Sequence, residues 1–254
     1  MSIKETLITS GRDLKILCLH GIGTNSDVCY SSSRLLYVIQ YLFVSSFRYY
    51  LGDGYQYDFV DGGHLWPAAP GIVETFGPQQ VCYSYSDGTA LGSITAVDDL
   101  AAYIIENGPF DSILGFSMGT ALAATLLLRP KGDLEDSHTH ACARRMIRSA
   151  VFVCGTLPVD RNELAKGKMG WLVASQVEAS PAAVWPTIDI PTVHAWSPQD
   201  EEYPGQSEEL ICMCSEKTRI EVLHGAKHGF PSKAQEVAEL VTIAKEMFAR
   251  LGHN

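Results

Sequence analysis

A serine lies between two glycines in the sequence GFSMG, residues 115–119. This is the G-x-S-x-G pattern, in which a sharp strand-to-helix turn presents a nucleophilic hydroxyl. The context agrees with the pattern, because the apolar run DSILGF ends just before Ser117 and the helical sequence MGTALAATLLL follows it. The alternative is an ordinary glycine-containing loop, since the bare pattern is common. We predict that Ser117 is a nucleophile at a helix N-terminus, where the helix dipole favours developing negative charge.

A serine hydroxyl becomes a good nucleophile only when a base accepts its proton. In α/β proteins that carry this motif after a strand, the catalytic residues follow one another along the chain in the order serine, acid, histidine. His228, in HGAKHGFP, follows the last predicted strand and is predicted as the base, with His224 as the alternative. The acid is expected in TVHAWSPQDEEY, after the preceding strand, and position favours Asp200 over Glu201 and Glu202. The alternative for each of these carboxylates is a solvated acidic turn.

Acyl transfer also needs two N–H donors for the tetrahedral intermediate. The backbone N–H of Met118, which follows the nucleophile, is predicted as one donor, and that of Ile22, in the glycine-containing loop CLHGIGTN, as the other. His64, Leu65 and Trp66 lie in the Gly- and Pro-rich stretch VDGGHLWPAAPG. These three side chains either bind the acyl part of a substrate or cap a loop.

Short apolar runs alternate with helical patterns along the chain, which predicts a mostly parallel sheet of the α/β class, covered by helices on both faces. The runs are nearly continuous in apolar residues, as doubly covered strands should be. Strands are predicted at residues 15–19, 57–60, 81–85, 111–116, 149–154, 192–196 and 219–223, and helices at 94–106, 118–128 and 232–251. We expect residues 1–254 to form a single domain, with an irregular, lid-like excursion over the site at 156–190.

Composition excludes several classes of protein. The formal net charge of −10 argues against a nucleic-acid partner, which would require a basic face. The chain has no apolar run long enough to span a membrane and no signal-peptide core at its start. Seven scattered cysteines predict reduced thiols and a cytoplasmic location. His138, His140 and Cys142 have alternate spacing but no second ligand cluster, so no metal site is predicted.

Several segments resemble the FSH family of fungal serine hydrolases, namely KILCLHGIGTN, YDFVDG, APGI, GPFDSILGFSMGTALAA, SPQDEEY and HGAKHGFP. The resemblance covers nearly the whole chain and is closest to the subgroup that accompanies polyketide synthases. It implies an α/β-hydrolase fold with a nucleophile elbow, and a triad of Ser117, Asp200 and His228 that needs no cofactor. It also implies a small-molecule ester or acyl thioester as substrate and an acyl carrier domain of a polyketide synthase as partner. Met118 departs from the glutamine usual after the nucleophile.

Three functions fit these sequence features. The leading hypothesis is a serine hydrolase that cleaves an ester or thioester through an acyl-enzyme and releases a polyketide from its synthase. The second is a small-ester carboxylesterase of general metabolism. The third is a non-catalytic α/β-hydrolase-like protein that binds a small molecule or a protein.

Residues 30–50 are longer and more apolar than the corresponding segment of the resembling family. Three interpretations compete for them. The stretch forms a helix packed on the core or over an acyl pocket, it provides a membrane-surface or partner-docking patch, or it is non-native sequence such as translated intron.

Overall fold

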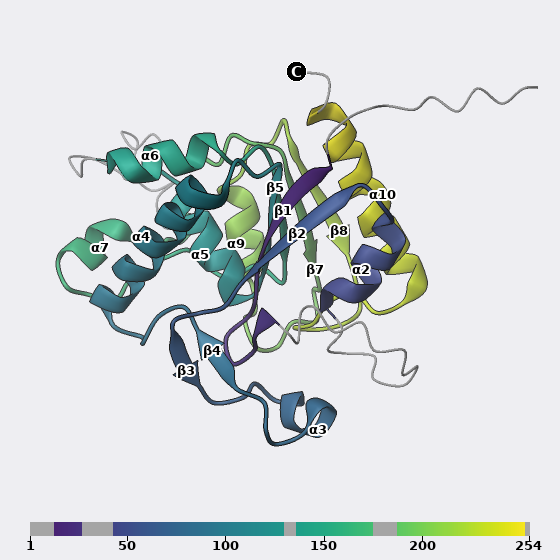
Figure 1. Cartoon of the computed structure of the whole chain (residues 1–254), viewed down its shortest axis with the longest axis horizontal. Coiled ribbons are helices and arrows are strands. Elements are labelled where there is room, and N and C mark those ends of the chain that lie inside the picture. Colours follow the sequence, from purple (N-terminus) through teal and green to yellow (C-terminus); the bar gives the residue numbers. More distant parts are fainter. Residues whose placement is uncertain (1–12, 27–42, 130–135, 175–186, 252–254) are drawn as a thin grey trace, which may run out of the picture.

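The computed structural model describes residues 13–26, 43–129, 136–174 and 187–251, and it has a parallel sheet with helices on both faces (Figure 1). The strands of this sheet lie in the order β2-β1-β5-β6-β7-β8, and every neighbouring pair is parallel. They are β1 (Leu14–Leu19), β2 (Tyr55–Val60), β5 (Ser112–Phe116), β6 (Ala150–Val153), β7 (Thr192–Trp196) and β8 (Arg219–Leu223). The predicted α/β class is confirmed.

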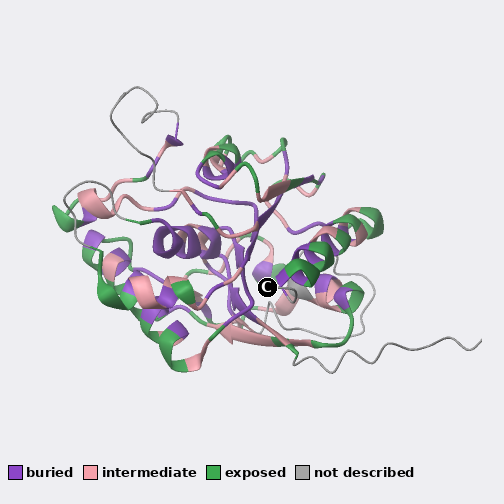
Figure 2. Ribbon diagram, turned by 90° about the horizontal axis from the view of Figure 1, so that it is seen from above, coloured by how far each residue is buried: buried purple, intermediate pink, exposed green. Residues whose placement is uncertain are grey.

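Two groups of helices cover the two faces of the sheet (Figure 1). On one face, α2 (Phe43–Leu51) packs against α10 (Ala234–Leu251). On the other face lie α4 (Ala90–Asn107), α5 (Met118–Leu127), α6 (His138–Arg145) and α9 (Gln206–Cys212), and α7 (Arg161–Ala165) packs against α4. Figure 2 shows that α5 is buried along most of its length, whereas the other helices expose their outer faces.

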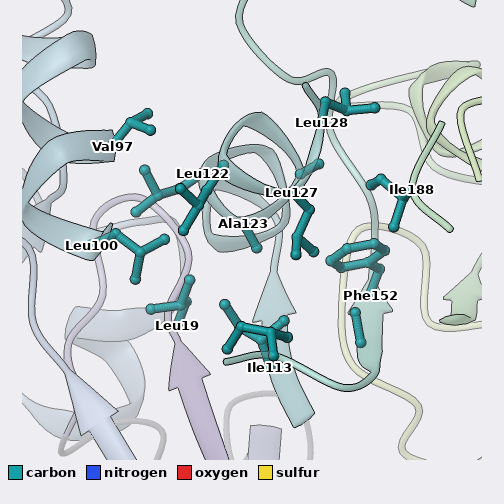
Figure 3. Packing of buried hydrophobic residues seen from close by; sticks show 14 of the residues in the cluster. Leu19, Val97, Leu100, Ile113, Leu122, Ala123, Leu127, Leu128, Phe152 and Ile188 are labelled. Carbon is teal, nitrogen blue, oxygen red and sulfur yellow. The ribbon is translucent and has the colours of Figure 1, made fainter. Parts of the chain in front are cut away.

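The alternation of side chains along β1 divides the core into two clusters. Ile16 and Cys18 face α2 and α10, whereas Leu17 and Leu19 face α4 and α5. This is the period of two that a strand imposes, and each face meets a helical layer because both faces carry apolar side chains. Figure 3 shows the second cluster, in which Leu19 lies below α5.

A second, two-stranded sheet lies beside the main one. Its strands, β3 (His64–Trp66) and β4 (Cys82–Ser84), are antiparallel, and α3 (Ile72–Phe76) lies between them in the chain. Residues 81–85 were predicted as a strand, but they belong to this small sheet rather than to the main one. Hydrogen bonds from Gly23 N–H to the Tyr83 carbonyl (2.9 Å) and from Tyr83 N–H to the Thr24 carbonyl (2.8 Å) attach β4 to the loop after β1.

Part of the apolar stretch 30–50 forms α2, in which Phe47 and Leu51 are buried against the core. For these residues the core-helix interpretation is confirmed. Residues 30–42 lie outside the described residues, so the docking and non-native interpretations remain predictions there. The excursion at 156–190 contains α7 and a bridge between Val159 and Trp171, while residues 175–186 lie outside the described part. Its lid function and the single-domain organisation also remain predictions.

No helix within the described residues has the length and apolar character needed to cross a membrane.

Candidate active site

Ser117 occupies a strained turn between β5 and α5. Its backbone is left-handed at φ 49° and ψ −117°, a region that non-glycine residues enter rarely. The flanking glycines make the turn sterically feasible. A Cβ at Gly119 would lie 2.5 Å from the Leu19 carbonyl oxygen, and a Cβ at Gly115 would lie 2.8 Å from the Gly119 carbonyl carbon. The Ser117 N–H donates to the Val153 carbonyl (3.0 Å), so the strained residue continues the β5–β6 ladder.

The predicted base and acid lie beside this serine, and both come from loops at the carboxyl ends of neighbouring strands. His228 Nε2 is 2.8 Å from Ser117 Oγ, and His228 Nδ1 is 2.7 Å from Asp200 Oδ2. The other carboxylate oxygen, Asp200 Oδ1, accepts from the N–H groups of Glu202 and Tyr203, each at 3.1 Å. These partners assign the Nδ1 proton to the carboxylate contact, which leaves Nε2 free to accept the serine proton.

The alternative residues take other roles. His224 is buried, and its ring Nδ1 accepts from the Ala226 N–H (3.3 Å). Its backbone N–H donates to the Trp196 carbonyl (3.0 Å). Burial lowers the pKa of His224, so it stays neutral as a structural residue. Glu201 forms an exposed ion pair with Lys227 at 3.4 Å.

The loop after β1 contains a hydrogen-bond clamp that orients one predicted oxyanion donor. The Gly21 carbonyl lies 2.6 Å from His20 Nδ1 and accepts from Thr24 Oγ1 at 2.7 Å. Since the Gly62 N–H donates to His20 Nε2 (3.0 Å), the ring proton is on Nδ1 and points at the Gly21 carbonyl. In a trans peptide the C=O and N–H point in opposite directions, so this clamp turns the Ile22 N–H away from His20. Burial lowers the pKa of His20 and keeps the ring in this neutral form.

Met118 supplies the second predicted donor because it is the first residue of α5, whose N–H lacks an intrahelical acceptor. Within the described part of the chain, no hydrogen bond is found from the backbone N–H of Met118 or of Ile22. Both groups therefore remain able to bind an incoming oxyanion.

A cavity of about 340 Å³ opens directly on Ser117 and His228. Its wall includes Ile22, Trp66, residues 67–70, Phe116, Glu202 and Tyr203. The Tyr203 ring packs against the His228 imidazole, with centroids 4.7 Å apart. Most of the lining residues are apolar or aromatic, but backbone polar groups, Ser117, Glu202 and His228 also reach its surface, so the cavity suits a small organic molecule that carries polar groups.

Of the three predicted substrate-binding residues, only Trp66 lines this cavity. Leu65 is 75% exposed to solvent and lies outside this cavity wall, so its role in binding stays a prediction. The alternation of β3 explains the difference, since Leu65 points to the opposite side of the strand from Trp66. His64 lies on the same side as Trp66 but two residues earlier in β3, outside the cavity wall.

Cys154, which belongs to none of the predicted motifs, lies behind the triad. It follows β6 with a left-handed φ of 48°, and its buried Sγ donates to the Gly229 carbonyl at 3.1 Å, next to His228. Burial raises the pKa of this thiol, so it is a neutral donor. Among the described residues, Cys154, Asp200 and His228 are the one group of three potential metal ligands close together, within 4.8 Å, and hydrogen bonds already engage all three. The only sequence signal for Cys154 is its place at a strand end.

Comparisons with known proteins identify the family of this chain. A family model described as "Serine hydrolase (FSH1)" matches residues 9–240. Esterase FPY3 of Fusarium mangiferae is 32% identical over 92% of this chain and 95% of its own length. Esterase FUS5 of Gibberella fujikuroi is 27% identical over 90% of this chain and 86% of its own.

Solved structures show the same fold. A carboxylesterase from Mesorhizobium loti superposes with a TM-score of 0.56 at 12% identity, covering 92% of this chain and 90% of the other. A Bacillus cereus carboxylesterase gives a TM-score of 0.53 at 14% identity, covering 92% and 89%. The α/β-hydrolase fold expected from the sequence is confirmed.

Proposed function

The chain belongs to the FSH1 family of serine hydrolases, and from this premise we propose that it cleaves an ester or acyl thioester through an acyl-enzyme on Ser117. One observation carries the assignment of residues: His228 bridges Ser117 Oγ at 2.8 Å and Asp200 at 2.7 Å. A nucleophile within reach of a base that is itself oriented by a carboxylate is the arrangement that acyl transfer needs.

Acylation begins when Ser117 Oγ attacks the substrate carbonyl and His228 Nε2 takes the hydroxyl proton. The imidazolium that forms is stabilised by Asp200, whose position is held by two backbone N–H donors. The N–H groups of Ile22 and Met118 bind the oxyanion of the tetrahedral intermediate. The C–O or C–S bond then breaks, and His228 returns the proton to the alcohol or thiol that leaves.

Deacylation repeats the same steps with water as the nucleophile. His228 Nε2 accepts a proton from water, the hydroxide attacks the acyl-serine carbonyl, and the same two N–H groups bind the second oxyanion. Collapse of this intermediate returns the proton from His228 to Ser117 Oγ and releases the carboxylic acid. No step requires a group beyond this chain, the substrate and water.

We extend the proposal to a thioester carried by an acyl carrier domain of a polyketide synthase. The support is the likeness to the polyketide-associated subgroup and the opening of the 340 Å³ cavity directly onto Ser117. A cytoplasmic location is proposed as well, since the six described cysteines are all free, as in a reducing compartment.

A fluorophosphonate probe tests the assignment of the nucleophile. The wild type and Ser215→Ala, which removes a hydroxyl from the turn before β8, at the opposite end of that strand from His228, should both be labelled. Ser117→Ala should not be labelled. Labelling of Ser117→Ala would overturn the assignment, and a folded wild type that takes no label would favour the non-catalytic binding protein.

The choice of leaving group needs a second experiment. Hydrolysis of an acyl-pantetheine thioester is compared with that of the p-nitrophenyl ester of the same acid. A higher kcat/KM for the pantetheine thioester supports the carrier-linked function. An equal or higher value for the simple ester supports the general carboxylesterase instead.

A further inference from the structure

We propose that a second cavity, between α4 and α5, binds the acyl chain of the substrate, and that the Met118 side chain is its gate. The proposal rests on Ser117 being the nucleophile. The cavity has a volume of about 60 Å³ and is separate from the larger one at the triad. Figure 3 shows the two helices that enclose it, with Val97 of α4 directed toward Leu122 of α5.

The cavity begins next to the nucleophile and leads away from it. Met118 directly follows Ser117 and forms part of the cavity wall. Ala121, Leu122 and Thr125 also line it, so the wall follows positions i, i+3, i+4 and i+7 on one face of α5. Seven residues of α-helix advance about 10 Å, so the wall extends about that far from the reacting centre.

The wall accepts hydrocarbon and offers nothing to a polar ligand. None of its residues is charged, and every hydroxyl in it already has a partner. Ser86 Oγ and Ser93 Oγ are 3.1 Å apart and share a hydrogen bond. Thr125 Oγ1 donates to the Ala121 carbonyl (2.7 Å) and accepts from the Val159 N–H (3.1 Å). The remaining hydroxyl, that of Tyr85, donates to the Val60 carbonyl (2.9 Å). A polar ligand would lose its hydration there without new hydrogen bonds, whereas an alkyl chain loses nothing.

Size and flexibility set the length of that chain. A cavity of about 150 Å³ holds a benzene ring, so about 60 Å³ holds roughly two or three carbon atoms. Met118 is unbranched and flexible, and only a weak hydrogen bond from Ser84 Oγ (3.5 Å) holds its sulfur. Rotation of this side chain joins the cavity to the reacting centre. The acyl chain then lies along α5, and the larger alcohol or thiol part occupies the 340 Å³ cavity.

Two matched substitutions distinguish the cavities. Ala121→Leu fills the small cavity, and Ala68→Leu places the same side chain in the large one. Hydrolysis of p-nitrophenyl acetate, butyrate, hexanoate and octanoate is measured for each variant. We expect Ala121→Leu to lower the butyrate-to-acetate ratio of kcat/KM by at least about 10-fold, since one methylene in an apolar pocket is worth about 10–200-fold. Ala68→Leu should leave that ratio unchanged.

A third variant and a covalent probe distinguish failure of the acyl subsite from failure of the proposed hydrolase function. Val97→Ala enlarges the small cavity and should move the preferred chain toward hexanoate. If Ala68→Leu changes the chain-length ratio and Ala121→Leu does not, the acyl chain lies in the large cavity and the inference is overturned. Fluorophosphonate labelling of all variants is measured in parallel. A wild type without labelling or hydrolysis would refute the proposed function itself, whereas labelling with unaltered chain preference refutes only the acyl subsite.

Discussion

Replacing Asp200 with asparagine should inactivate the enzyme by changing which ring nitrogen of His228 carries the proton. In the wild type, Asp200 Oδ1 accepts from the N–H groups of Glu202 and Tyr203, while Oδ2 lies 2.7 Å from His228 Nδ1. In Asp200→Asn, the amide oxygen remains with the two backbone donors, and the NH2 group faces Nδ1. The ring must then accept at Nδ1 and carry its proton on Nε2, where Ser117 needs an acceptor.

The expected loss in kcat is about 10⁴-fold, or about 5.4 kcal/mol, the effect of the wrong tautomer in a related constellation. Turning the amide over would restore the tautomer, but it would set NH2 against two N–H donors. Each unpaired donor costs about 1–3 kcal/mol, so the unproductive orientation dominates. The melting temperature should change little, because the backbone hydrogen bonds persist.

The assay is the initial rate of p-nitrophenyl butyrate hydrolysis at saturating substrate, with the rate of fluorophosphonate labelling as a second readout. Glu201→Gln is the matched control, since Glu201 is in the same loop but its side chain is 81% exposed and forms an ion pair with Lys227. Its kcat should stay within about threefold of the wild type, as expected for an exposed ion pair. Retention of more than a tenth of wild-type activity in Asp200→Asn, or an equal loss in Glu201→Gln, would refute the tautomer argument.

Three further predictions concern the loop after β1, the elbow and the buried histidines. His20→Phe removes the hydrogen bond that orients the loop after β1, and it should lower kcat by about 10²-fold with little change in KM. Steady-state kinetics measures both constants, and a change in KM alone would contradict this role of His20. Gly119→Ala should destabilise the fold by about 2 kcal/mol or more in urea unfolding, because its Cβ would lie 2.5 Å from the Leu19 carbonyl oxygen, whereas Gly63→Ala meets no atom within 4 Å and should be nearly neutral. Burial lowers the pKa of His194 to about 3, so the unfolded chain binds the extra proton below pH 6.5. The contribution of neutral His194 to the free energy of unfolding is then fully present above pH 6.5. Below that pH it falls by about 1.4 kcal/mol per pH unit, or about 2 kcal/mol by pH 5. His194→Asn should reduce this slope when the free energy of unfolding is measured against pH, and an unchanged slope would show that His194 does not cause it.

The central strands β1, β5, β6 and β7 were predictable because helices cover them on both faces and their residues are mostly buried. The predicted strands at 192–196 and 219–223 coincide with β7 and β8, and 57–60 falls within β2. Arg219 and Glu221 alternate with apolar residues in β8, as is typical of an edge strand. The triad followed from the same logic, since loops at the carboxyl ends of adjacent parallel strands meet at one edge. Ser117, Asp200 and His228 were therefore placed together by chain order alone.

The small sheet and the residues behind the triad were not predictable in the same way. β3 contains three residues, too few for a pattern of alternation to emerge, so the sequence did not separate Trp66 from Leu65 and His64. Tyr203 and Cys154 contact His228 or its loop only through the tertiary structure, and neither belongs to a motif. Periodicity reports which face a residue takes within its own element, and it does not report which distant loop that face meets.

Within the described residues, the three non-glycine positions with left-handed backbones are Ser117, Cys154 and Lys227, and all three lie at the triad. Two of them are held by the ladder of the neighbouring strand, through Ser117 N–H to the Val153 carbonyl and Cys154 N–H to the Ala195 carbonyl. The unfavourable conformations therefore cannot relax while the strands stay paired. The nucleophile therefore shares the rigidity of the sheet interior, so partial denaturation that spares the strands should leave the Ser117 turn in place.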